Sequence, residues 1–293
     1  MHRSGFVNII GNPNVGKSTL MNALVGEKLS IITSKAQTTR HRIMGIVSGE
    51  DFQIVYSDTP GILKPSYKLQ ESMMKFVTGA LTDADVILYV TDTVEQSERS
   101  AEIVDSIRRS GIPTVVVINK IDLSTPEALE ALVDKWQAEI PGAQVVPTSA
   151  KENFNIEGLF RTILSLLPEG PAFYPKDTLT DKTLRFFASE IIREKILKFY
   201  DKEIPSCCEI EIESYKEEPT IDRISATIYV ARDSQKGILI GHKGEKLKRV
   251  GQTAREDMEQ FLGKKVFLQL FVKVSDDWRN NERQLRRFGY EQE

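Results

Sequence analysis

A glycine-rich segment near the N-terminus constrains this chain more than any other feature. The segment Gly11-Asn-Pro-Asn-Val-Gly-Lys-Ser18 fits the pattern G-x-x-x-x-G-K-[ST]. It follows the apolar, β-branched run Phe6–Ile10 and precedes a helical pattern from Ser18 to Val25. Strand, loop and helix in this order expose backbone N–H groups and a helix N-terminus to an anion. A glycine-rich turn without a ligand is the alternative. We predict a loop that holds the phosphates of a nucleotide.

The loop supplies the phosphate and magnesium contacts. Lys17 is expected to reach the β- and γ-phosphates, and the Ser18 hydroxyl to join the Mg²⁺ shell. The other contact residues predicted in this stretch are Gly11, Asn14, Val15, Gly16 and Thr19.

A second segment, Asp58-Thr-Pro-Gly61, follows the strand-like stretch Phe52–Ser57. In a doubly wound sheet this order places Asp58 beside the phosphate loop, where its carboxylate would hold Mg²⁺ through a water. Gly61 lacks a side chain, so its N–H can approach a γ-phosphate and sense whether that group is present. Alone, the tetrapeptide also fits an ordinary turn.

Base identity is predicted from Asn119-Lys-Ile-Asp122, which follows the apolar run Thr114–Ile118. Guanine has two adjacent donors that one carboxylate, Asp122, can accept, whereas adenine places an acceptor there. Asn119 is expected to brace the loop, and the stem of Lys120 to lie against the purine. These roles predict GTP rather than ATP as the ligand.

A fourth segment, Ser149-Ala-Lys151, follows the predicted strand Gln144–Pro147. The Ala150 N–H is expected to donate to guanine O6, with Ser149 and Lys151 beside it. Each segment could arise by chance, but four in this order require one pocket for phosphates, magnesium and guanine.

The polar segment Lys35–His41 lies between the first two motifs. A nucleotide switch needs a mobile hydroxyl that coordinates Mg²⁺ only when the γ-phosphate is bound. Thr38 and Thr39 are both candidates, and we choose Thr39 as the third metal ligand after Ser18 and Asp58. A solvated loop is the alternative for either threonine.

The predicted chemistry of hydrolysis is unusual. Ile62 stands directly after Asp58-Thr-Pro-Gly61, where small signalling GTPases have the glutamine that orients the attacking water. Asn14 is a candidate for holding a monovalent cation such as K⁺, although it could equally bond its own backbone. We therefore predict slow intrinsic turnover, with Lys17, Thr39 and Asn14 as the catalytic residues.

Length and composition fit a two-domain cytoplasmic protein. The 293 residues exceed what one nucleotide-binding domain needs. The net charge of −3 predicts no overall attraction to nucleic acid, so such contacts must come from local clusters. Cys207 and Cys208 are adjacent in a predicted strand and fit neither a disulfide nor a metal site. A membrane span and a signal peptide are not expected either, because long apolar runs are absent from the sequence.

The domain boundary is predicted at a proline-rich stretch. We expect a GTP-binding domain over residues 1–170, a linker over 171–181 and a second domain over 182–293. The first should be a doubly wound α/β fold with a mostly parallel sheet, since apolar runs alternate with helical patterns. Further runs in the first domain are predicted as a strand (Val86–Val90) and as helices (Tyr67–Ala80, Ser97–Arg109, Pro126–Ala138 and Ile156–Leu166).

The second domain has the element order of an α+β, type II KH domain. A helix (Thr183–Tyr200), two strands (Ser206–Tyr215 and Ile221–Ala231), a helix, Gly-x-x-Gly, a helix and a strand (Lys265–Val274) follow one another. The Gly-x-x-Gly turn lets a single-stranded RNA backbone approach the chain, and apolar Ile238, Leu239 and Ile240 are expected to support unstacked bases. The predicted RNA-binding residues are Lys236, Gly237, Ile240, Gly241, His242, Lys243, Gly244, Lys246, Lys248 and Arg249.

With these motifs the chain resembles the Era family of bacterial GTPases over essentially its whole length. The resemblance implies a GTPase that cycles between GTP and GDP, binds the 3′ end of 16S ribosomal RNA and assists maturation of the 30S subunit. It also implies a cytoplasmic protein, expected to be monomeric, with peripheral contact to the inner face of the membrane. The related Der family carries two nucleotide domains and fits worse, because one phosphate loop occurs here.

The mechanism expected from the sequence is a coupling between the two halves. GTP would order the segments around Thr39 and Asp58 and thereby change RNA affinity. Two alternatives are an RNA-binding protein whose nucleotide site is structural, and a metabolic NTPase or other ribosome-assembly GTPase.

Overall fold

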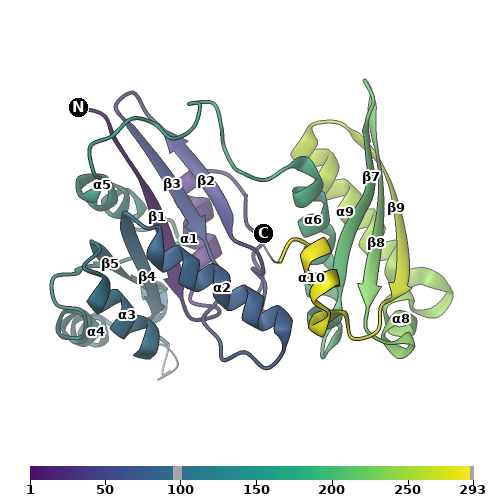
Figure 1. Ribbon diagram of the computed structural model, residues 1–293, viewed down its shortest axis with the longest axis horizontal. Coiled ribbons are helices and arrows are strands. Elements are labelled where there is room, and N and C mark those ends of the chain that lie inside the picture. Colours follow the sequence, from purple (N-terminus) through teal and green to yellow (C-terminus); the bar gives the residue numbers. More distant parts are fainter. Residues whose placement is uncertain (95–100, 291–293) are drawn as a thin grey trace. The chain divides into compact units, whose positions relative to one another are not determined.

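The computed structural model describes residues 1–94 and 101–290, which form two compact units. One unit comprises Met1–Pro65 and Met73–Asp181, and the other comprises Ser66–Ser72 and Lys182–Glu293. Figure 1 labels their helices and strands. No helix in the described ranges combines the length and apolar character needed to cross a membrane.

The N-terminal unit is built on a six-stranded sheet with the order β2-β3-β1-β4-β5-β6. β2 runs antiparallel to β3, and the other neighbours are parallel. The strands are β1 (Arg3–Gly11), β2 (Ile43–Ser48), β3 (Phe52–Asp58), β4 (Val86–Asp92), β5 (Thr114–Asn119) and β6 (Gln144–Pro147). The predicted mostly parallel sheet is therefore confirmed.

Helices lie on both faces of this sheet, as a doubly wound fold requires. They are α1 (Lys17–Val25), α2 (Lys68–Thr82), α3 (Ala101–Ser110), α4 (Pro126–Glu139) and α5 (Ile156–Leu166), with a short 3₁₀ turn η2 (Ile121–Leu123). Figure 1 shows α2 and α3 in front of the sheet and α1 behind it. The apolar side chains of α2, α3 and α4 enclose one core with Ile10 of β1 and with alternate residues of β4 and β5. The start of the predicted helix Ser97–Arg109 lies outside the described residues.

The predicted linker, residues 171–181, lies along the sheet of the N-terminal unit. Gln53 of β3 is buried, and its side chain accepts from the N–H groups of Phe173 and Tyr174 and donates to the Tyr174 carbonyl. Further along, Thr180 forms a bridge with Gly45 of β2, and the Ile46 N–H donates to the Leu179 carbonyl. We call residues 171–181 the strap, because they hold to β3 and then to the edge strand β2.

The C-terminal unit contains a three-stranded sheet, β7-β8-β9, in which β7 is antiparallel and β9 parallel to β8. Its elements are α6 (Leu184–Phe199), α7 (Ile204–Cys207), β7 (Glu209–Glu217), β8 (Ile221–Val230), α8 (Asp233–Ile240), η3 (His242–Gly244), α9 (Glu245–Leu262), β9 (Lys265–Val274), η4 (Trp278–Asn280) and α10 (Glu282–Arg287). This order confirms the predicted type II KH domain. One boundary was wrong, because Ser206 and Cys207 lie in α7 rather than in the following strand.

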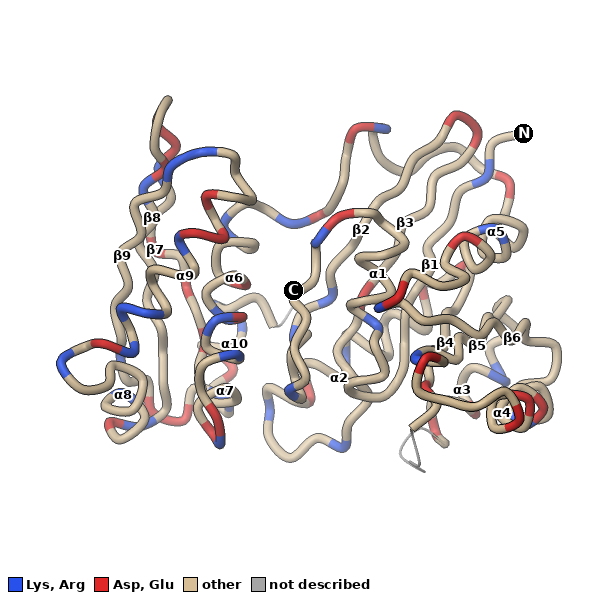
Figure 2. Tube along the Cα trace, turned by 180° about the vertical axis from the view of Figure 1, so that it is seen from behind, with Lys and Arg blue, Asp and Glu red and all other residues tan. Residues whose placement is uncertain are grey.

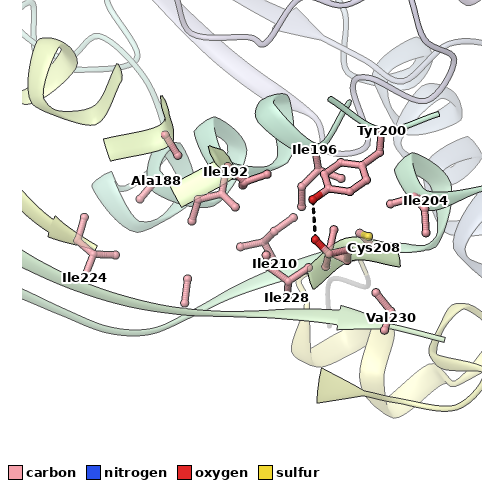
Figure 3. Packing of buried hydrophobic residues seen from close by; sticks show 14 of the residues in the cluster. Ala188, Ile192, Ile196, Tyr200, Ile204, Cys208, Ile210, Ile224, Ile228 and Val230 are labelled. Atoms are coloured by element: carbon pink, nitrogen blue, oxygen red, sulfur yellow. Dashed lines mark hydrogen bonds between the residues drawn. The ribbon is translucent and has the colours of Figure 1, made fainter. Parts of the chain in front are cut away.

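The core of this unit lies between one face of the sheet and the helices α6, α8 and α9 (Figure 3). Ile192 and Ile196 of α6 pack there against Ile228 of β8. The Tyr200 hydroxyl donates to the Leu239 carbonyl at 2.6 Å, which ties the end of α6 to α8. The thiols of Cys207 and Cys208 are buried in this core.

Candidate functional site

The phosphate loop begins where β1 ends and closes into α1, as the sequence predicts. Asn14 and Gly16 have positive φ values of 65° and 98°, so the chain reverses sharply over the N-terminus of α1. A Cβ on Gly11 would lie 2.1 Å from the Val90 carbonyl oxygen, and one on Gly16 would lie 2.2 Å from Asn119 Nδ2. Both glycines are thus required by close packing against neighbouring strands and loops.

Lys17 is buried beneath this loop. Its ammonium group donates to the carbonyls of Gly11 and Asn12, at 3.0 and 2.7 Å. A buried ammonium group at the N-terminus of a helix favours the binding of an anion at this loop. The loop borders a cavity of about 430 Å³, large enough for a small ligand.

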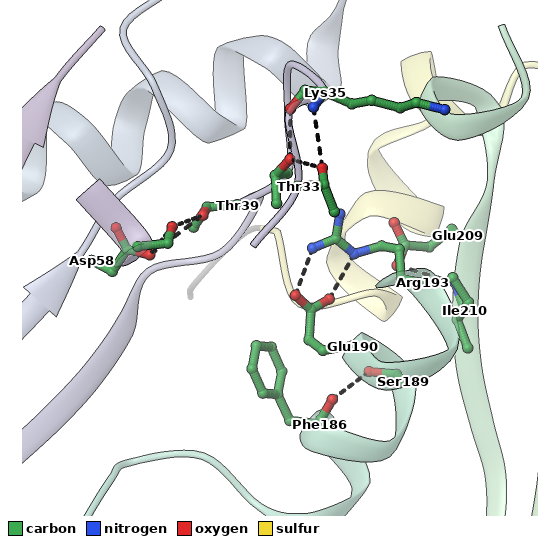
Figure 4. A network of polar contacts seen from close by, with 12 residues as sticks. Thr33, Lys35, Thr39, Asp58, Phe186, Ser189, Glu190, Arg193, Glu209 and Ile210 are labelled. Carbon is green, nitrogen blue, oxygen red and sulfur yellow. Dashed lines mark hydrogen bonds and ion pairs between the residues drawn. The ribbon is translucent and has the colours of Figure 1, made fainter. Parts of the chain in front are cut away.

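The three predicted magnesium ligands converge on one point. The Ser18 hydroxyl donates to Asp58 Oδ2 at 2.7 Å and lies 2.8 Å from the Thr39 hydroxyl. Thr39 Oγ1 in turn lies 3.3 Å from Asp58 Oδ2 (Figure 4). These residues come from α1, from the loop before β2 and from the end of β3.

Asp58 itself is a buried carboxylate that is only partly satisfied. Its Oδ1 atom has no hydrogen-bond partner in the described part of the chain. Burial raises the pKa of this carboxyl, while the hydrogen bond from Ser18 and the charge of Lys17 oppose that rise. A buried carboxylate oxygen without a partner, beside two hydroxyls, is an oxygen donor set that suits Mg²⁺.

The structure separates Thr38 from Thr39. The Thr38 hydroxyl donates to the Lys35 carbonyl and contacts the Thr33 hydroxyl at 2.6 Å, so it belongs to the turn of its own loop. Thr39 is buried and directed at Asp58. Of the two candidates, Thr39 has the geometry of a metal ligand.

The two segments predicted to recognise the base lie together at the ends of β5 and β6. Asn119 is buried and links two loops, since its Nδ2 donates to the Val15 carbonyl and its Oδ1 accepts the Ala150 N–H, both at 2.9 Å. Ser149 donates to Asp122 Oδ1 at 2.6 Å and thereby orients that carboxylate. The Ala150 N–H predicted to meet guanine O6 thus has an acceptor, Asn119 Oδ1, within the protein.

Lys120 is fixed by a contact that the sequence did not indicate. Its ammonium group lies 2.6 Å from Asp92 Oδ2, at the end of β4, and 2.6 Å from the Asn14 carbonyl. Asp92 is buried, so this ion pair holds the lysine stem over the phosphate loop. Lys151 also lines the cavity, together with Asn14, Thr19 and Gly61.

Ile62 points away from the cavity. It is 4% exposed and packs in the apolar core beneath α2 and α3. Its N–H donates to the Gly11 carbonyl, which fastens the Asp58-Thr-Pro-Gly61 loop to the phosphate loop. A side chain in this place does not orient a water, as the sequence analysis expected.

A polar network behind the site was also missed. Arg42 forms two hydrogen bonds to Asp83, after the end of α2, and one to Ser57, which precedes Asp58. Its Nη2 also donates to Asn8 Oδ1 at 3.2 Å. Arg42, three residues after Thr39, therefore anchors the segment that carries Thr39 to β3 and to the residue after α2.

The Gly-x-x-Gly turn of the C-terminal unit joins α8 to α9. Gly241, Lys243 and Gly244 have φ values of 74°, 49° and 79°. A Cβ on Gly244 would meet nothing within 4 Å, so the space over this glycine is open. Basic segments border α8 and the start of α9 (Figure 2). The turn therefore offers an open backbone with several cations beside it, although Asp233 and Glu245 begin the two flanking helices, and this arrangement favours a phosphodiester chain.

A groove of about 420 Å³ continues from the turn between α9 and β9. Of the predicted RNA-binding residues, Gly244 and Lys248 line it. Lys246 and Arg249 instead lie over the rings of Tyr200 and Phe199, at 5.8 and 4.2 Å from the ring centroids. The groove residues that sequence reasoning missed are Leu247, Gly251, Gln252, Arg255, Leu268 and Leu270. Their helical and strand spacing was visible, but which face they occupy was not.

Leu239 corrects the prediction for the apolar run before the turn. It is fully buried in the core of the C-terminal unit, so it offers no surface to bases. Ile238 is exposed and Ile240 is half-buried. Only these two remain available on the outside of α8.

The chain is similar to known proteins over both of its units. Residues 6–120 match the family model "50S ribosome-binding GTPase", and residues 203–279 match the KH domain model. The GTPase Era of Staphylococcus haemolyticus is 45% identical over 291 residues, which cover 99% of this chain and 97% of that protein. The GTPase Era of Alkaliphilus metalliredigens is 45% identical over 293 residues and 99% of each chain.

Two solved structures are similar over the whole molecule. Era in complex with MgGDPNP and nucleotides 1506–1542 of 16S ribosomal RNA has a TM-score of 0.96 and 40% identity, with 100% of both chains covered. A variant of Aquifex aeolicus Era bound to GDP and AlF₄⁻ has a TM-score of 0.95 and 40% identity, covering 99% of this chain and 100% of that one. The phosphate loop, the converging side chains of Ser18, Thr39 and Asp58 and the Gly-x-x-Gly turn thus occur together in a chain that belongs to the Era family of GTPases.

Proposed function

We propose that this protein is a GTP-hydrolysing switch that binds the 3′ end of 16S ribosomal RNA through its KH domain and assists maturation of the 30S subunit. The convergence of Ser18, Thr39 and Asp58 beside the phosphate loop carries the nucleotide half of this proposal. The RNA half rests on the Gly241–Gly244 turn, its groove and the RNA named for the similar Era complex.

In the nucleotide site, Ser18, Thr39 and Asp58 would hold Mg²⁺, which neutralises phosphate charge when it is bound. Asp58 presents an oxygen without a partner there, and the two hydroxyls supply further oxygen donors. Lys17 and the N–H groups of the loop bind the phosphates. Asp122, oriented by Ser149, accepts the two adjacent donors of guanine.

Hydrolysis requires a group that replaces the missing glutamine. Asn14 lines the cavity with a strained backbone, and we propose that its side chain helps to hold K⁺ next to the phosphates. Turnover in K⁺ should then exceed turnover in Na⁺ at equal ionic strength. Equal rates in the two salts would remove Asn14 from the catalytic residues.

The switch acts through Thr39. Its hydroxyl would contact Mg²⁺ and thereby order the Lys35–His41 segment only in the GTP state. We propose that this ordering changes RNA affinity, which binding of the 1506–1542 RNA fragment in the presence of GDP and of GDPNP would measure. Identical affinities would favour a structural nucleotide site instead.

The family resemblance predicts two further properties, a monomeric state and peripheral contact with the inner face of the membrane. Sedimentation with and without anionic lipid vesicles checks both. Calorimetry with GTP and Mg²⁺ is the primary test of the function, because a failure to bind GTP would contradict all of it.

A further inference from the structure

The sheet of the C-terminal unit has a second face, opposite the core. Side chains alternate along a strand, so Ile224, Ala226 and Ile228 of β8 point into the core. Their neighbours Arg223 and Ser225 therefore belong to the outer face. In the parallel register these two pair with Phe267 and Gln269 of β9.

The chain covers one end of this outer face with its own C-terminal segment. Trp278 donates its indole N–H to the Cys207 carbonyl at 2.9 Å, and the Phe288 ring packs 5.4 Å from that of Tyr229. Arg287 forms two hydrogen bonds to Glu211, and the Tyr290 hydroxyl donates to Glu209 at 2.5 Å. Aromatic rings and satisfied carboxylates therefore close that end.

The other end of the outer face carries two exposed aromatic rings. Phe267 is 43% exposed and Phe271 is 48% exposed. They are four residues apart on β9, which corresponds to about 13 Å along the strand. Gln269 lies between them, and all three side chains are on one side of the strand. We call Arg223, Phe267, Gln269 and Phe271 the outer platform.

The chemistry of the outer platform matches unpaired bases better than a protein surface. Its rings are separated by a polar residue, whereas the centre of a protein interface is a contiguous apolar patch. Exposed rings bind bases of any sequence by stacking, and Gln269 offers both a donor and an acceptor to a base edge. The Arg223 guanidinium lies 5.4 Å from the Phe267 ring centroid, so one cation is already part of the stack.

Two basic side chains of this face are paired with carboxylates. Arg223 bonds to Glu218 at 3.0 Å, and Lys273 pairs with Glu213 at 2.9 Å. Attraction to phosphate is therefore weaker here than at the Gly-x-x-Gly turn, and stacking should supply most of the binding. Affinity gained on the outer platform should depend less on salt than affinity gained at the turn.

The outer platform continues the RNA groove around one strand. Leu268 and Leu270 of β9 line the groove, and Phe267 and Phe271 of the same strand lie on its opposite side. β9 is an edge of the described three-stranded sheet, so a nucleic acid can pass around it. A KH groove clamps about four nucleotides, which leaves the remainder of a longer RNA unplaced.

We propose that the outer platform is a second RNA-binding surface, on which bases beyond the groove stack on Phe267 and Phe271. This inference rests on the proposed RNA-binding function of the groove. It assigns to β9 two roles, one on each side of the strand.

The test compares a long and a short RNA. The long probe is the fragment of nucleotides 1506–1542, and the short probe is an unpaired RNA of about four nucleotides that fills the groove alone. The double variant Phe267→Ala with Phe271→Ala should bind the long probe about 30-fold more weakly and the short probe as the native protein does. Phe154→Ala, which removes an exposed ring of the N-terminal unit, is the matched control and should bind both normally.

A second variant keeps the test independent of folding. Phe271→Trp retains a ring for stacking, so it should bind the long probe normally and show fluorescence quenching with that probe but not with the short one. Gly244→Asp should weaken the binding of both probes, and this variant therefore tests the groove separately. The proposal would be refuted if the double alanine variant bound the long probe as tightly as the native protein does, or if the long probe did not quench the fluorescence of Phe271→Trp. Either result would count against the outer platform even if Gly244→Asp behaves as expected. The outer platform would then be a surface for a protein.

Discussion

Gly61 provides the sharpest test of the nucleotide switch. A methyl group added at this position would lie 2.8 Å from Pro13 Cα and 2.9 Å from Pro13 N, both in the backbone of the phosphate loop. An ordinary carbon contact needs about 3.5 Å, so Gly61→Ala must move the two loops apart by about 0.7 Å. That shift would stretch a hydrogen bond of ordinary length, about 2.9 Å, from the Gly61 N–H to a γ-phosphate to about 3.6 Å, beyond its useful range.

The expected loss follows from the charge of the acceptor. A hydrogen bond to a charged group contributes about 1.5–3 kcal/mol, which corresponds to an affinity for GDPNP that is weaker by about 10- to 150-fold. GDP lacks the γ-phosphate, so its affinity should change by less than about threefold. Titration calorimetry of both nucleotides with Mg²⁺ measures the difference.

A matched glycine substitution serves as the control. Gly79 lies in α2, and a methyl group there would meet nothing within 4 Å, so Gly79→Ala should leave both affinities unchanged. Equal losses of GDP and GDPNP affinity in Gly61→Ala would refute the reasoning, because they would show a general distortion of the phosphate loop. Unchanged GDPNP affinity would show that the Gly61 N–H does not contact the γ-phosphate.

Three further perturbations probe other parts of the N-terminal unit. Asp122→Asn should shift preference from GTP to xanthosine triphosphate by about tenfold or more in a competition assay, and retained GTP selectivity would contradict the base assignment. Asp58→Asn removes a buried carboxylate whose pKa is raised in the folded state by burial. Native stability without nucleotide should therefore fall as pH rises from the ordinary carboxyl pKa through the raised one, and thermal unfolding of the variant should lack this fall. The same variant should lose Mg²⁺-dependent nucleotide binding, and a pH profile like that of the native protein would show that Asp58 is not the group responsible. Gln53→Leu leaves two strap N–H groups without their acceptor and should cost about 2–4 kcal/mol, detectable as faster proteolysis within residues 171–181, whereas unchanged cleavage would mean that the strap is held elsewhere.

The ends of the parallel strands could be predicted well from the sequence. Their apolar runs are long and β-branched, and a doubly wound sheet brings their carboxyl ends to one edge. The motifs at Lys17, Asp58 and Asn119 therefore came together as expected from local patterns alone.

Contacts between distant segments could not be predicted in the same way. Gln53 binds backbone groups 120 and 121 residues away, and Arg42 meets Asp83 across the sheet. Neither residue belongs to a recognisable pattern, because one polar side chain in a strand is also typical of a solvent-facing position. The prediction that Leu239 supports bases was wrong for a related reason. A run of three apolar residues does not reveal which of them faces the core in a short helix.

The strap also determines how truncated fragments of the N-terminal unit should behave. By bonding to Gly45 and Ile46 it occupies the outer hydrogen-bonding groups of β2, at the border of the six-stranded sheet. A fragment that stops at residue 170 would leave that border bare and open to pairing with another molecule, whereas one extended to residue 181 would keep it closed. If the shorter fragment self-associates, the cause is the exposed edge of β2 that the truncation creates, not the nucleotide-binding fold itself.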